Sequence, residues 1–179
     1  MTIKTTIIII SSAMLSLNSF AQERRSSPLS IATTRYKDTY VKIVYSQPLK
    51  KGRDIFGQLV PYGEVWRTGA NEATEITITT NIIVNGQELI TGTYSIFTIP
   101  GEDSWVVIFN ADLGLWGSYN YNQKRDVLRI EVPVQLQSET TEAFTIGFDP
   151  RNNVADWYFK WDKTKVVVPI QFVEPKPKP

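Results

Sequence analysis

The amino-acid sequence predicts an all-β protein: a single antiparallel β-sandwich, jelly-roll-like, with about nine or ten strands. Two observations support this fold class. Apolar and polar residues alternate with a period of two in most segments, and turn residues separate these segments at intervals of roughly 8–15 residues. No window of useful length shows the helical period. A closed β-barrel, which has the same strand pattern, is the alternative.

Each expected strand is an alternating or a continuously apolar run. The pair Asn85-Gly86 stands between two short apolar runs and is the strongest short hairpin signal. Trp157, Phe159 and Trp161 share one strand face, which favours a place in the core, with an exposed binding platform as the alternative. The last segment is expected to form two strands joined at residues 162–164. The expected segments are 39–46, 74–80, 81–90, 93–100, 104–112, 126–137, 142–150 and 154–173.

The first 21 residues have the layout of a secretory signal peptide. Lys4 and the amino terminus form a short positive region, and Ile7 to Leu17 is a mainly apolar segment. Ser19 and Ala21 then place small residues at positions −3 and −1 of a cut before Gln22. We therefore expect an exported protein, located in the periplasm or outside the cell.

Removal of these residues leaves 179 − 21 = 158 residues, the length of one ordinary domain. A flexible leader is expected at residues 22–29 and a β-sandwich domain at 30–172. Residues 173–179 alternate Pro with Lys at their end, which is typical of a solvated, extended tail.

The composition excludes several classes of chemistry. The chain has no His and no Cys, so Ser-His-Asp and Cys-His catalysis, His-ligated metals and disulfides are impossible. We expect no metal and no cofactor. The 19 basic and 18 acidic residues become 18 and 18 when Lys4 is removed. This balance provides no basic excess for binding nucleic acid or an anionic membrane.

Two long connections, residues 47–73 and 112–125, interrupt the strand pattern. Long ordered connections are often functional, and the aromatic and apolar residues inside both argue against disorder. The first connection contains dense hydrogen-bonding and charged chemistry, much of it in the stretch GEVWRTGANEATEI, residues 63–76. The candidate ligand-binding residues in the two connections are Arg53, Tyr62, Glu64, Trp66, Arg67, Asn71, Glu72, Trp116 and Tyr119.

Two interpretations of these residues stay open. In the functional one, Arg53 and Arg67 bind a carboxylate or sulfate and an aromatic ring stacks on a sugar face. Asn71 would then position a ligand hydroxyl together with Glu72. In the structural one, the same side chains hold the long loop through internal hydrogen bonds, and the aromatic residues of 112–125 pack over the end of the sandwich.

A pair of carboxylates would be required for glycoside hydrolysis. Glu72 and Glu75 are close in sequence, but they have opposite parity and face opposite sides if both are extended. The pair is therefore a poor catalytic dyad unless the loop bends.

Three long stretches resemble a known bacterial family. They are YSQPLKKGRDIFGQLVPYGEVWRTGANEATEI, NGQELITGTYSIFTIPGEDSWVVIFN and the late KWDKTKVVVPI. Together they are similar to the domain of unknown function 2911, across roughly residues 30–172. The resemblance implies a secreted protein of the type common in Bacteroidota, and it brings no assigned catalytic residues. Gln47 stands where the family more often has Arg.

The sequence thus favours an exported, non-catalytic binding module for a carbohydrate or another small polar ligand. One alternative is a carboxylate-based glycoside hydrolase or lyase that uses Glu64, Glu72 or Tyr62. Another alternative is an envelope structural or partner-binding protein with an exposed apolar patch or an unpaired edge strand. The oligomeric state stays open.

Overall fold

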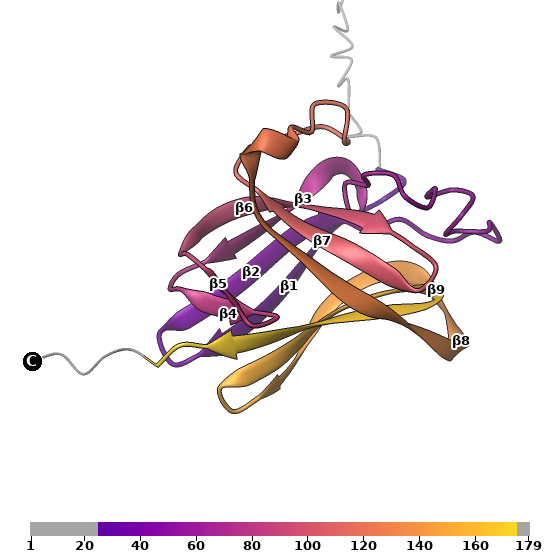
Figure 1. Cartoon of the computed structure of the whole chain (residues 1–179). Helices are drawn as coiled ribbons and strands as arrows, with labels where there is room; N and C mark the ends of the chain where they lie inside the picture. Colours follow the sequence, from indigo (N-terminus) through magenta and orange to yellow (C-terminus); the bar gives the residue numbers. More distant parts are fainter. Residues whose placement is uncertain (1–24, 175–179) are drawn as a thin grey trace, which may run out of the picture.

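The computed structural model describes residues 25–174, and nine β-strands make up most of them (Figure 1). None of the described helical segments is long and apolar enough to cross a membrane. The expected signal peptide, residues 22–24 of the expected leader and the last five residues of the tail lie outside the described residues. The elements are β1 (Leu29–Tyr36), β2 (Thr39–Ser46), β3 (Ala70–Ile78), β4 (Ile82–Val84), β5 (Gln87–Leu89), β6 (Gly92–Pro100), β7 (Ser104–Asn110), the 3₁₀ turn η1 (Gln123–Arg125), β8 (Asp126–Arg151) and β9 (Val154–Phe172).

The nine strands form one sheet in which every neighbouring pair is antiparallel. Their order is β1-β2-β3-β6-β7-β8-β9-β4-β5, so most strands lie beside the strand that precedes them in the chain. The predictions of an all-β antiparallel fold and of the number of strands are confirmed. Strands β1 and β5 stand at the two ends of this order, so the sheet is open and the closed-barrel alternative is wrong.

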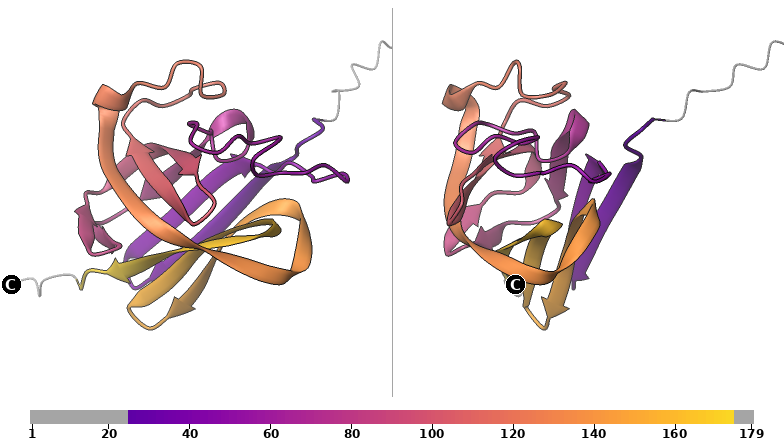
Figure 2. Two further views of the ribbon diagram at one scale, coloured as in Figure 1. Left: turned by 45° about the vertical axis from the view of Figure 1, so that its right-hand side comes forward. Right: turned by 90° about the vertical axis from the view of Figure 1, so that its right-hand side faces the viewer.

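Strand β8 connects the two parts of the sheet. Residues 126–133 pair with β7, whereas residues 134–151 pair with β9. Figures 1 and 2 show the bent ribbon of β8 and β9 crossing the strands that precede them, so that the two parts of the sheet face each other. This arrangement encloses a single large core.

Aromatic side chains fill the core between the two parts of the sheet. Trp157, Phe159 and Trp161 of β9 have exposed fractions of 0%, 1% and 2%, which confirms that this stripe is internal. Across the core, Tyr45 of β2 meets Phe144 of β8 with ring centroids 5.9 Å apart. Edge-to-face contacts of this kind add to the apolar burial of each ring. The core therefore holds both parts of the sheet together.

Two pairs of expected strands are each continuous in the structure. Strand β8 runs through the polar residues between 137 and 145, with register shifts on both sides of Thr141. Strand β9 runs through Asp162, which adopts a left-handed backbone with φ 52° and accepts a hydrogen bond from Lys50. Both breaks expected from sequence are thus local irregularities within long, bent strands.

The hairpin predicted at Asn85-Gly86 is confirmed. It joins β4 to β5, and both turn residues have positive φ, 47° and 79°. These values are typical of the two-residue turns that match the twist of a hairpin. Strand β1, by contrast, is not among the segments identified from sequence, and it occupies an end of the sheet.

The connection after β7 covers the outer face of the sheet. Leu115 and Tyr121 pack on a small cluster made by Ala73, Phe97 and Ile108. The Tyr121 ring lies 4.9 Å from that of Phe97. The connection between residues 112 and 125 is therefore anchored to the fold, and of its aromatic residues Tyr121 packs as the structural interpretation expects, whereas Trp116 and Tyr119 are exposed.

Candidate functional site

The long connection between β2 and β3 is anchored to the core at several points. Ile55, Val60 and Trp66 are 1%, 4% and 8% exposed. The backbone of Trp66 exchanges two hydrogen bonds with Thr98 of β6, 2.7 and 2.9 Å long. These contacts give the connection a fixed position at one end of the sheet (Figure 2).

The corner that leads into β3 is held by buried hydroxyl groups. The Thr74 hydroxyl donates to the Thr68 carbonyl at 2.6 Å, and the Thr68 hydroxyl donates to that of Thr98 at 3.1 Å. The Trp66 indole donates to the Gly69 carbonyl at 3.1 Å. A Cβ atom on Gly69 would lie 2.9 Å from the backbone oxygen of Ser46, so only glycine fits there. Much of the 63–76 stretch is therefore a structural corner.

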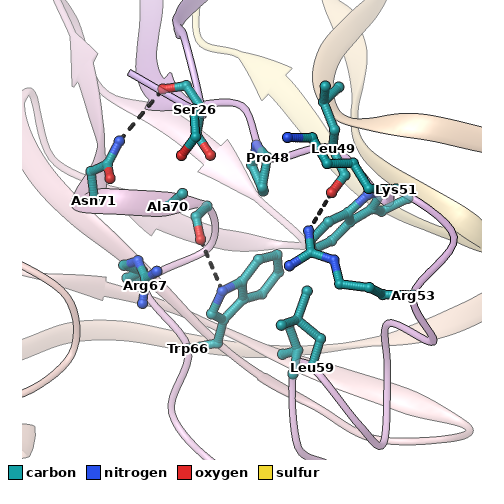
Figure 3. A pocket seen from close by; sticks show the side chains of 14 residues that line it. Ser26, Pro48, Leu49, Lys51, Arg53, Leu59, Trp66, Arg67, Ala70 and Asn71 are labelled. Carbon is teal, nitrogen blue, oxygen red and sulfur yellow. Dashed lines mark hydrogen bonds between the residues drawn. The ribbon is translucent and has the colours of Figure 1, made fainter. Parts of the chain in front are cut away.

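A cavity of about 490 Å³ opens beside this corner (Figure 3). Its volume lies within the range of small-molecule binding sites. The lining combines apolar and aromatic groups with three basic side chains, and the described lining contains no acidic residue. The lining residues are Ser26, Ser27, Pro48, Leu49, Lys51, Arg53, Leu59, Val60, Trp66, Arg67, Gly69, Ala70, Asn71 and Trp161.

Arg67 is the most buried of the three charged groups in this cavity. Its side chain is half-buried, and its buried Nε has no hydrogen-bond partner. Among the ion pairs of residues 25–174, none includes Arg67. Burial lowers the pKa of its guanidinium, and nearby Tyr119 opposes this effect. An arginine in a protein stays protonated nevertheless, so the cavity contains an uncompensated positive charge.

Arg53 and Asn71 line the cavity but are partly engaged by backbone carbonyl groups. Arg53 donates from Nε to the Lys50 carbonyl at 2.9 Å and from Nη2 to the Leu49 carbonyl at 2.5 Å. Asn71 donates to the Ser27 carbonyl at 3.5 Å, which is a long bond. Figure 3 shows Arg67 and Asn71 on one side of the Trp66 ring and Arg53 on the other.

The aromatic floor of the cavity is rigid. The Trp66 and Trp161 rings are stacked with centroids 6.0 Å apart and an interplanar angle of 15°. The Trp161 indole donates to the Glu142 carbonyl at 3.1 Å. A ligand in the cavity would therefore meet a preformed apolar surface between its basic groups.

Glu72 does not line this cavity. Its carboxylate binds Arg25, with two oxygen–nitrogen distances of 2.8 and 2.9 Å. Hydrogen bonds from its own backbone and from Arg25 hold the pKa of Glu72 below its ordinary value, against the effect of burial. Arg25 precedes Ser26 and Ser27 of the cavity wall, so Glu72 acts on the cavity indirectly by fixing that segment.

Glu72 and Glu75 lie against one cavity of about 200 Å³ in spite of their opposite parity. The left-handed backbone of Asn71, with φ 59°, and the register shift beside Ser46 bend the chain at the start of β3. The Glu75 carboxylate accepts a hydrogen bond from the Gly114 amide at 2.9 Å. Within residues 25–174, no group of three or more His, Cys, Asp or Glu side chains could hold a metal ion.

The other four candidates lie outside the larger cavity. Tyr62 is 40% exposed and covers Gly57, and Glu64 is exposed. Burial, with nearby Glu102, raises the pKa of Tyr62. Trp116 and Tyr119 are 57% and 84% exposed.

Sequence reasoning missed several residues of the cavity wall. Lys51 stands next to Gly52 in the punctuated stretch before Arg53, where its charge could have been noted. Ser26 and Ser27 were expected in a flexible leader, and nothing in their sequence indicates a wall. Trp161 was assigned to the core, where it lies, and it also lines the cavity.

Comparison with known proteins gives one match. A family model described as "Protein of unknown function (DUF2911)" matches residues 27–170, which is most of the chain. No curated protein and no solved structure matches the chain significantly.

Proposed function

Because the chain belongs to the DUF2911 family, whose description assigns no activity, we propose a function from the site itself: a non-catalytic binding module for a small polar ligand that carries a carboxylate or a sulfate. The observation that carries this proposal is the half-buried Arg67, with its unpartnered Nε and no acidic partner, in the wall of the 490 Å³ cavity. A partly buried charge without a counter-charge is costly to a protein, and an anionic ligand bound by the guanidinium group would compensate it.

Charge complementarity supports an anion. Lys51, Arg53 and Arg67 all line the cavity, and its described wall contains no acidic side chain. The guanidinium group binds carboxylate and sulfate oxygens through directed hydrogen bonds. Asn71, whose contact with the Ser27 carbonyl is long, offers an amide for a ligand hydroxyl.

The carboxylates support binding in preference to hydrolysis. Glu72 is paired with Arg25, and Glu75 accepts from the Gly114 amide. Both lie against the smaller cavity, and Glu64 is exposed away from the larger one. A glycoside hydrolase needs two carboxyl groups beside the scissile bond, and the larger cavity does not bring any together. Export, expected from the first 21 residues, would place this binding site in the periplasm or outside the cell.

Titration of the isotope-labelled protein, followed by NMR, tests this proposal. Glucuronate and sulfate should shift the Trp66 indole, the Asn71 side-chain amide and the Arg67 Nε signals. Glucose, which has the same ring without the carboxylate, should shift them much less. The proposal is wrong if neither anion moves these signals, or if the anions shift exposed basic residues elsewhere, such as Arg151, to the same extent.

A second candidate function is attachment to a protein partner through the edge of the sheet. Strand β1 is at one end of the strand order, and Leu29 and Ile31 on it are 61% and 60% exposed. An exposed edge strand is a template for pairing with another chain. Light scattering should then detect self-association, or a partner should be captured, and replacement of Ile31 by Lys should abolish either interaction. A wild-type protein that stays monomeric at all concentrations and captures no partner would exclude this candidate.

A further inference from the structure

Two exposed aromatic rings lie on the connection next to the cavity. Trp116 and Tyr119 are 57% and 84% exposed, although Leu115 and Tyr121 in the same connection are packed on the outer face. Large exposed aromatic rings on an otherwise anchored loop are unusual in a monomeric protein and mark interaction sites. Neither ring lines the cavity, so a ligand confined to the cavity would not contact them.

Backbone contacts fix these rings close to the cavity wall. The Gly117 amide donates to the Asn71 carbonyl at 2.9 Å, and Trp116 forms a β-bridge with Glu72. The Ala73 amide donates to the Leu115 carbonyl at 2.8 Å. Asn71 lines the cavity, so Trp116 and Gly117 lie directly behind one of its walls.

The Tyr119 ring lies against Gly117 and is otherwise exposed. A Cβ atom on Gly117 would lie 2.8 Å from the Tyr119 ring, so this ring rests on the Gly117 backbone. Figures 1 and 2 show the connection before η1 at the same end of the sheet as the connection between β2 and β3. Burial lowers the pKa of Arg67, and Tyr119 opposes this effect. The backbone that carries the two rings is thus fixed beside a wall of the basic cavity.

From this juxtaposition we infer that the ligand is an acidic oligosaccharide, with one uronate or sulfated unit in the basic cavity and adjacent units along Trp116 and Tyr119. This inference rests on the proposed anion-binding function and names its ligand class. A sugar ring presents an apolar face to an aromatic ring and hydroxyl groups to its edge, which suits amphipathic Trp and Tyr side chains. The charge of Lys51, Arg53 and Arg67 selects acidic units over neutral ones.

Chain-length dependence of binding tests this inference. Calorimetry should give about tenfold tighter binding of a tetragalacturonate than of galacturonate, since aromatic residues in interfaces commonly contribute effects of that size. Neutral maltotetraose should bind weakly. In Trp116→Ala the tetramer should lose most of this gain, while the monomer binds as before. Leu113→Ala, which removes another exposed apolar side chain of the same connection, should leave both unchanged.

Every other outcome of these measurements contradicts either the oligosaccharide inference or the proposed anion binding. The oligosaccharide inference is wrong if monomer and tetramer bind with equal affinity, or if Trp116→Ala does not change the affinity for the tetramer. Neither result contradicts the proposed binding of an anion in the cavity. Failure of monomer and tetramer alike overturns the proposed function and this inference together. If Trp116→Ala and Tyr119→Ala change only the oligomeric state, the aromatic face is a protein contact and the inference is wrong.

Discussion

Replacement of Arg67 by Met should stabilise the free protein and weaken its anion binding. The side chain keeps its apolar stem, but the unpartnered Nε and the charge are lost. A buried unsatisfied donor costs about 1–3 kcal/mol. Arg67 is only half-buried, so we expect the lower value, about 1 kcal/mol, as a gain in the free energy of unfolding. For a chain of this size, that gain corresponds to an increase in Tm of about 2–4 °C.

The same substitution should lower glucuronate affinity by about tenfold or more, because hydrogen bonds to charged groups contribute about 1.5–3 kcal/mol. Calorimetric unfolding of each protein with and without glucuronate measures both the change in stability and the change in glucuronate affinity. Arg35→Met is the matched control. Arg35 is exposed and pairs with Tyr40 of β2, near the end of β1 that is farther in the chain from Ser26 and Ser27 of the cavity wall. This substitution should change neither the affinity nor the stabilisation by ligand. A lower Tm for Arg67→Met, or unchanged glucuronate binding, would refute the reasoning.

Three further predictions concern the framework of the site. Gly69→Ala places a Cβ 2.9 Å from the Ser46 oxygen, so urea unfolding should show a loss of about 1–3 kcal/mol, and an unchanged midpoint would contradict the close contact. Asn85→Ala should cost about 1 kcal/mol in the same assay because φ is 47°, whereas Asn85→Gly should cost less. The Glu72 pKa lies below its ordinary 4.5, so stability from its pairing with Arg25 is full above that pH and is lost as pH falls through the lower, folded-state value. Glu72→Gln should therefore be less stable by at most about 0.5 kcal/mol at pH 7, and this difference should disappear once the pH falls below the folded-state pKa.

The strand pattern was predictable because burial alternates along most strands. Residues 39–46 and 93–100 match β2 and β6 closely, and the Asn85-Gly86 turn is set by local backbone preferences. The ends of the strands were harder to predict because the alternation of apolar and polar residues does not show which strands pair with each other. The polar residues near Thr141 look like a loop, yet β8 continues through them because β9 pairs with it on both sides.

The candidate site was predictable in its residue types and only partly in its geometry. Arg53, Trp66, Arg67 and Asn71 do converge on one cavity. Glu72 directly follows Asn71 and was expected at the same site. The left-handed backbone of Asn71, however, turns the chain and directs the Glu72 side chain to the smaller cavity. Asn71 lies in β3 and not in a two-residue turn like that of Asn85, so its positive φ depends on tertiary contacts, which a single sequence does not contain.

The corner before β3 explains why structural and binding interpretations of residues 63–76 were hard to separate. Thr68, Thr74 and the Trp66 indole are used by internal hydrogen bonds. Arg67 stands among them without such a bond. Neighbouring residues in one short stretch thus differ in whether their side chains have an internal partner, and sequence alone does not show this difference.

The pairing of β4 with the end of β9 has a consequence for the order of folding. Most strands pair with their neighbours in the chain, but Ile82 pairs with Phe172, roughly 90 residues later. Contacts of high sequence separation form late, since long loops must close first. The sheet remains incomplete until residue 172 is available to pair with Ile82, so a growing chain reaches its final form only after nearly all of the described residues have been synthesised.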